Sequence, residues 1–223
     1  MKQQRSWRKR LASVLAAGVI LLPGAYGLSP APVAHAEFGW GSVISAGIQG
    51  AIAHAQLNEF LKKYNDSEEG RQEFFEEMKK QYGVYYNRKI DTIMANLTAA
   101  IGAVDPTIYD KPYNYFINQD QSFNAFCTIG HNMSINTGLF SILTNDDEIA
   151  VVLGHEMAHG QKDHPAKGAR RSLNMSILGA ATGTDLGAIV AGVINNRNIT
   201  KPMEREADAL AFEYITHSNY NPG

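Results

Sequence analysis

The sequence HEMAH at residues 155–159 constrains the fold more than any other segment, because it places two histidines four residues apart with a glutamate after the first. Residues four apart lie on one face of an α-helix, so the imidazoles of His155 and His159 can reach one metal ion. Glu156 lies one position round the helix, where it is better placed to hold a water molecule than to bind that ion. The alternative is a pair of solvent-facing histidines on an ordinary helix, and a third ligand would decide between the two.

The third ligand must come from elsewhere in the chain, and two known spacings are absent. A longer motif has a glycine three residues and a histidine six residues after its second histidine, but Lys162 and Pro165 occupy those positions. Another arrangement has a glutamate roughly 20 to 25 residues further on, but no glutamate occurs between His159 and Glu204. His164 lies one position away from the longer motif and is only a weak candidate.

Glu204 is the first glutamate after the motif, on a helix predicted from about Thr200 to His217. Asp208 shares its helix face and could accept a hydrogen bond from a ligand histidine, which would fix the tautomer of that ring. Glu206 stays open as an alternative ligand, but it lies about 200° round the helix from Glu204, so both cannot bind one ion. Two nitrogens, one carboxylate and an open position fit one Zn²⁺ per chain best.

The other patterns predict helices and a small amount of strand. Helices are expected over residues 42–64, 66–102, 144–165 and 200–217, and an interruption at Gly83 is the alternative to one continuous second helix. A strand is expected over Tyr113–Asn118, and a hairpin over Asn124–Gly138 with Gly130 near its bend. In the second arm of the hairpin, Met133 and Ile135 alternate with Asn132, Ser134 and Asn136, which predicts a strand with one buried face.

The N-terminus has the features of a secretory signal peptide. Five basic residues among the first ten precede an apolar run, Leu11–Leu22, and the A-x-A pattern Ala34-His35-Ala36 follows. We place cleavage before Glu37, so the protein is expected to be exported to the periplasm or cell envelope, or secreted. An uncleaved membrane anchor is the alternative, although spanning a bilayer takes roughly 20 apolar residues. The apolar segment 177–194 is interpreted as a helical hairpin or covering loop, with peripheral membrane contact as its alternative.

Composition excludes other classes of protein. The 223 residues carry a formal net charge of -2, and the only basic cluster is the one that the signal peptide explains, so no concentrated basic face of the kind that binds nucleic acid is indicated. A hydrophobic content of 44% is that of a globular domain. Cys127 is the only cysteine, which rules out an internal disulfide. We interpret it as a small buried residue, with a nucleophile as the alternative.

The segments GHEMAHG and EREADALAF together resemble the M48 peptidases, the family that includes the Ste24-type CAAX proteases and several exported bacterial members. That family has H-E-x-x-H followed by E-x-x-x-D, and the matching residues here are His155, Glu156, His159, Glu204 and Asp208. NAFCTIGHNMSINTGLF and SNYNPG are also similar to family segments, so the resemblance covers about residues 113–223. The single N-terminal apolar segment is typical of the exported type rather than of the integral-membrane members.

The resemblance implies a fold and a domain division. The fold class is α+β, a mainly helical zincin-like domain with a small sheet or hairpin beside the helix that carries HEMAH. Residues 1–36 would form the signal peptide, 37–110 an N-terminal helical region and 111–223 the peptidase core. Because many members continue for further helices, a core ending at Gly223 is expected to be a short or truncated one.

The resemblance also implies an activity, a zinc-dependent endopeptidase with Glu156 as general base and proteins or peptides as substrates. Proteins of the envelope or of outer-membrane assembly are the expected partners. The strand at residues 132–137 could pair with an extended substrate, which would make Asn132, Ser134 and Asn136 substrate-binding residues. The competing hypothesis is a chaperone-like or binding module with an occluded or structural zinc site.

Overall fold

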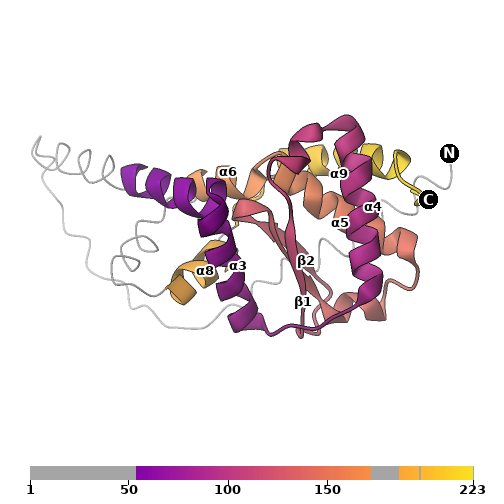
Figure 1. Cartoon of the computed structure of the whole chain (residues 1–223), viewed down its shortest axis with the longest axis horizontal. Helices are drawn as coiled ribbons and strands as arrows, with labels where there is room; N and C mark the ends of the chain where they lie inside the picture. Colours follow the sequence, from indigo (N-terminus) through magenta and orange to yellow (C-terminus); the bar gives the residue numbers. More distant parts are fainter. Residues whose placement is uncertain (1–53, 172–185, 196, 223) are drawn as a thin grey trace, which may run out of the picture.

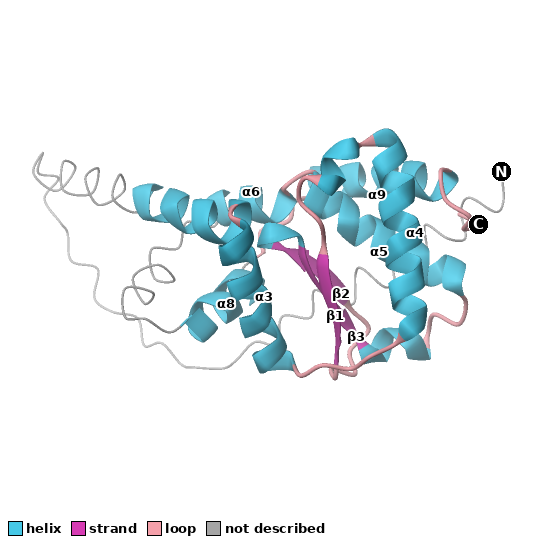
Figure 2. Ribbon diagram, in the orientation of Figure 1, coloured by secondary structure: helices cyan, strands magenta, loops and turns pink. Residues whose placement is uncertain are grey.

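A three-stranded sheet lies between two layers of helices in the computed structural model, which describes residues 54–171, 186–195 and 197–222 (Figure 1). The strand order is β1-β3-β2. β1 (Asn114–Asn118) runs parallel to β3 (Asn132–Asn136), and β2 (Ala125–Thr128) runs antiparallel to β3, which confirms the predicted strand and hairpin. The expected α+β class, mainly helical with a small sheet, is also confirmed (Figure 2). The predicted signal peptide lies outside the described residues, as do parts of the first helix and of the segment 177–194.

Helices cover both faces of the sheet (Figure 1). The first layer contains α3 (Glu68–Tyr82), α6 (His164–Arg171), α8 (Leu186–Asn195) and the helical residues 54–61, which end in a π-helical turn at Lys62–Asp66. The second layer contains α4 (Arg88–Val104), α5 (Asp146–Gln161) and α9 (Lys201–Thr216). Short 3-10 turns occur at Pro106–Tyr109, Ile129–His131 and Thr137–Ser141. No helix among the described residues has the length and apolar character needed to cross a bilayer.

The sheet divides the hydrophobic core into two clusters. Side chains such as Cys127, Met133 and Ile135 pack with α4, α5 and α9 on one face. Phe116 and Phe126 pack with α3, α6 and α8 on the other. Because both faces are covered, every residue of β3 is buried. The prediction that this strand has only one buried face is therefore wrong.

The helix that carries HEMAH begins as predicted and ends earlier. Asn145 caps α5, since its side-chain oxygen accepts a hydrogen bond from the Glu148 N–H at 2.8 Å. α5 ends at Gln161 rather than at Pro165, and Asp163 then adopts a left-handed φ of 52° that redirects the chain. Pro165 lies in the first turn of α6, where a missing N–H costs nothing. The prediction of one continuous helix to Pro165 is wrong for this reason.

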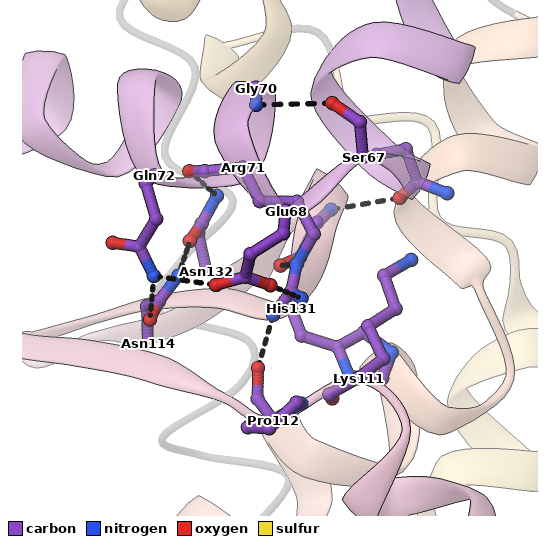
Figure 3. A network of polar contacts seen from close by, with 12 residues as sticks. Ser67, Glu68, Gly70, Arg71, Gln72, Lys111, Pro112, Asn114, His131 and Asn132 are labelled. Carbon is purple, nitrogen blue, oxygen red and sulfur yellow. Dashed lines mark hydrogen bonds and ion pairs between the residues drawn. The ribbon is translucent and has the colours of Figure 1, made fainter.

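A buried arginine joins α3 to the bend of the hairpin (Figure 3). The side chain of Arg71 is 3% exposed. Its Nε donates to the Gly130 carbonyl at 2.7 Å, its Nη2 donates to the Pro112 carbonyl, and its Nη1 pairs with Glu68 at 2.7 Å. Gly130 has a φ of 73° and its N–H donates to the Asn65 side chain at 2.8 Å, so the bend is held from two sides.

We expect Arg71→Met to lower the free energy of unfolding by roughly 2–4 kcal/mol, because it leaves the buried Gly130 carbonyl without a donor, removes the part-buried bond to the Pro112 carbonyl and breaks the pairing with Glu68, while it keeps much of the packed stem. Urea unfolding followed by circular dichroism measures this change. Arg88→Met is the matched control, since Arg88 is exposed at the start of α4 and its replacement should shift stability by no more than about 0.5 kcal/mol. Equal effects of the two substitutions would contradict a stabilising role for the Arg71 contacts.

Candidate metal centre

Two packed helices bring the predicted site residues together. α5 carries His155, Glu156 and His159, and α9 carries Glu204 and Asp208. The two helices lie side by side in the same layer (Figure 1). Alanines at positions 207 and 211 are fully buried along α9, and small side chains of this kind let two helix backbones approach closely. The close approach allows carboxylates on α9 to reach imidazoles on α5.

Three donor atoms converge between these helices. The Nε2 atoms of His155 and His159 are 3.0 Å apart, and Glu204 Oε2 lies 3.4 Å from the first and 3.8 Å from the second. Tetrahedral ligands at about 2.1 Å from a zinc ion lie about 3.4 Å from one another. Both histidines are buried and Glu204 is half-buried. The spacing and chemistry of this donor set therefore fit a zinc ion.

Asp208 lies behind the first histidine. Its Oδ1 is 3.1 Å from His155 Nδ1. Among the described residues, neither of these two buried atoms has another hydrogen-bond partner. Burial would lower the pKa of His155, but the carboxylates of Asp208 and Glu204 raise it to about 10. Burial would raise the pKa of Glu204, whereas hydrogen bonds from His155 and His159 hold it well below its usual range. The negative charge of Glu204 thus lies beside the two Nε2 atoms that face the centre, and that of Asp208 lies behind the ring of His155, so both favour a cation there.

Glu156 is held beside the edge of the sheet. Its side chain is buried, and Oε2 accepts a hydrogen bond from the Cys127 N–H on β2 at 3.0 Å. The second carboxylate oxygen is not committed to this contact. Glu156 is absent from the group of converging donor atoms, as its position one residue round the helix predicts.

Arg197 is a nearby cation that the sequence did not single out. Its guanidinium lies 4.4 Å from the centre of the Phe126 ring on β2, and its Nε donates to the Ile194 carbonyl at 3.1 Å. Burial lowers the pKa of Arg197, whereas the charge of Glu156 raises it. A positive charge therefore lies within electrostatic range of Glu156. Nothing in the surrounding asparagine-rich sequence distinguishes this arginine from a surface residue.

The two weaker ligand candidates lie one layer behind His159. His164 Nδ1 is 3.0 Å from His159 Nδ1, and His164 Nε2 is 3.1 Å from Glu206 Oε2. Neither His164 nor Glu206 is among the three converging donors. Glu206 lies on the other side of α9 from Glu204, as the helical angle between them predicts.

The predicted substrate-binding residues are not near a free surface. β3 is the central strand, with β1 along one edge and β2 along the other, so the prediction that it pairs with a substrate is wrong. The side chains of Asn132, Ser134 and Asn136 are buried and bonded within the protein. Ser134 and Asn136 both accept from Asn118 Nδ2, at 2.7 and 2.6 Å, and Asn132 accepts from Asn114 Nδ2 at 3.0 Å.

Cys127 is a core residue, as interpreted from the sequence. It is 2% exposed, and burial raises the pKa of its thiol far above the range in which a thiolate forms. The cysteine contributes to the site through its backbone N–H and not through sulfur.

The sequence is similar to known proteins over most of these helices and strands. The model of Peptidase family M48 matches residues 86–223, which includes α4 and every element after it. A putative beta-barrel assembly-enhancing protease of Vibrio cholerae is 29% identical over 151 residues, covering 60% of this chain and 30% of the relative. The metalloprotease LoiP of Escherichia coli is 26% identical over 137 residues, covering 56% and 54%. A mitochondrial metalloendopeptidase of Saccharomyces cerevisiae is 32% identical over 107 residues, covering 44% and 30%.

The chain thus spans about a third to a half of the length of these relatives. The family match is broader, since it takes in more than half of the chain and includes both helices that form the centre. On this match, the chain belongs to peptidase family M48.

Proposed function

We propose that the chain is an exported, zinc-dependent endopeptidase that acts in protein quality control in the cell envelope. The observation that carries the proposal is the convergence of His155, His159 and Glu204, with the carboxylate of Glu156 beside them. Membership of a family of metallopeptidases supports the same reaction class.

His155, His159 and Glu204 would hold the metal, and Asp208 would fix the ring of His155. A zinc ion in such a set supplies Lewis-acid activation of a water molecule and of a peptide carbonyl. Glu156 takes the proton of the attacking water and transfers it to the leaving amine. The hydrogen bond from Cys127 holds one oxygen of Glu156 and leaves the other for this proton.

The substrate would bind as an extended strand along β2 and not along β3, which is the central strand of the sheet. Among the described strands, β2 pairs only with β3, and the N–H of Cys127 is directed to Glu156 instead of to a neighbouring strand. A peptide added at this edge would pass beside the general base. Backbone pairing of this kind selects for unfolded segments and not for a particular sequence.

The proposed export rests on the N-terminal sequence, and the proposed partners rest on one relative. The basic residues, apolar run and A-x-A pattern within residues 1–36 support export. The relative from Vibrio cholerae is described as enhancing beta-barrel assembly, which supports envelope or outer-membrane assembly proteins as substrates of this chain.

Metal analysis combined with casein digestion tests the proposal. We expect the purified mature chain to contain about one zinc ion and to cleave casein. A chelator should stop the cleavage, and added zinc should restore it. Digestion that resists the chelator would exclude a metallopeptidase. Retained zinc without digestion of casein or of short peptides would favour the competing hypothesis of a binding module.

A further inference from the structure

His164 is a further histidine, buried directly behind His159. His164 is 1% exposed and begins α6, immediately after Asp163 with its left-handed φ of 52°. This turn brings the His164 ring against His159, with the ring centres 5.0 Å apart and the two Nδ1 atoms 3.0 Å apart. On its other side, His164 Nε2 lies 3.1 Å from Glu206 Oε2. A carboxylate and two imidazoles therefore form one continuous row.

The positions of the protons along this row follow if His159 binds the metal through Nε2. His159 directs Nε2 at His155 and Glu204, so Nε2 must be free of a proton if it binds a metal. The neutral ring then carries its proton on Nδ1, and only this proton can bridge the two Nδ1 atoms. His164 Nδ1 is the acceptor, which places the proton of His164 on Nε2, where the Glu206 carboxylate accepts it.

We propose that His164 and Glu206 are positioning residues for His159, an inference that rests on the proposed metal-binding role of that histidine. Glu206 fixes the tautomer of His164, and His164 in turn fixes the tautomer and orientation of His159. Asp208 contacts His155 directly, whereas Glu206 acts on His159 through His164. We call the pair of His164 and Glu206 the relay.

The relay gives each acidic residue of the segment EREAD a separate role. Glu204 faces the converging donors, Asp208 on the same side contacts His155, and Glu206 on the other side of α9 contacts His164. The end of α6 also contacts the start of α9, where Arg171 Nη1 donates to Thr200 Oγ1 at 3.4 Å and lies 3.6 Å from Met203 Sδ. One helix thus supports both ligand histidines from two directions.

Zinc affinity of the purified chain, measured by competition with a chromophoric chelator, tests the relay without reference to activity. His164→Phe removes the acceptor and is expected to weaken zinc binding about 10- to 100-fold. His164→Asn should recover most of the affinity, because its amide oxygen can accept the proton from His159. Glu206→Ala should weaken binding in the same direction. Glu213→Ala, at an exposed position on the same helix, is the control and should bind zinc as the unsubstituted chain does.

The tautomers provide a second readout that does not depend on any substitution. Long-range ¹⁵N–¹H correlation spectra of the zinc-loaded chain should show the proton of His159 on Nδ1 and that of His164 on Nε2. The opposite tautomer of His164, or a His164→Phe variant that binds zinc as tightly as the unsubstituted chain, would overturn the relay alone. Failure of the unsubstituted chain to bind zinc would overturn the proposed function and the relay together.

Discussion

Glu156→Gln is expected to slow casein cleavage by about 10²–10⁴-fold while the zinc content of the chain stays unchanged. Glutamine has the volume of glutamate, and its amide oxygen can accept the hydrogen bond that Cys127 donates to Glu156 at 3.0 Å. The local structure should therefore be kept. The amide cannot take a proton from water, so the variant loses the base and nothing else.

The measurement is the initial rate of fluorogenic casein cleavage, with zinc content determined on the same preparation. Glu213→Gln is the matched control, because it makes the same chemical change at an exposed position on α9 and should leave both quantities unchanged. If Glu156→Gln cleaves casein at the unsubstituted rate, Glu156 is not the general base. If it loses zinc, its role lies in holding the centre together.

The part of the centre that the sequence predicts depends on helical geometry and on the few acidic residues that could complete the donor set. Spacings of four place His155 with His159 and Glu204 with Asp208, each pair on one helix face. Glutamate is absent between the two segments, which leaves few residues that could complete the donor set. Such rules hold because helical spacing is fixed by the backbone and changes little with tertiary context.

The positions that sequence patterns miss are those that depend on tertiary packing. The alternating polar residues of β3, such as Ser134, resemble the exposed face of an edge strand. Their burial follows from the cover that α3 and α8 provide and from the central position of β3, and neither is encoded locally. The domain boundary at residue 110 stays a prediction, and α4 on its N-terminal side contributes to the same core cluster as α5.

The position of His164 depends on tertiary packing for a related reason. The sequence pattern predicts that Pro165 ends the helix that carries HEMAH, which would leave His164 at the helix terminus. The structure ends α5 at Gln161 and begins a second helix at His164, so the proline starts α6 instead of stopping α5. The change of direction depends on the φ of 52° at Asp163, a conformation that its side chain tolerates but does not require. A sequence pattern cannot distinguish these two uses of a proline.

Glu204→Gln is expected to weaken zinc binding by at least about 100-fold, more than the loss of a residue behind a ligand histidine. The charged oxygen of Glu204 lies 3.4 Å from His155 Nε2 and 3.8 Å from His159 Nε2, and a neutral amide replaces it with a much poorer donor. Thermal unfolding with and without zinc measures the effect. A free zinc concentration 100 times the dissociation constant stabilises a folded chain by about 2.7 kcal/mol, and most of that increment should vanish in the variant.

The two substitutions together separate the roles of the glutamates. Glu156→Gln should keep the zinc-dependent rise in melting temperature and lose cleavage, whereas Glu204→Gln should lose both. A Glu204→Gln variant that keeps the full rise would place the third ligand elsewhere. Glu206 could take that place only by leaving His164, because its carboxylate now lies 3.1 Å from His164 Nε2 and on the opposite side of α9 from the converging donors.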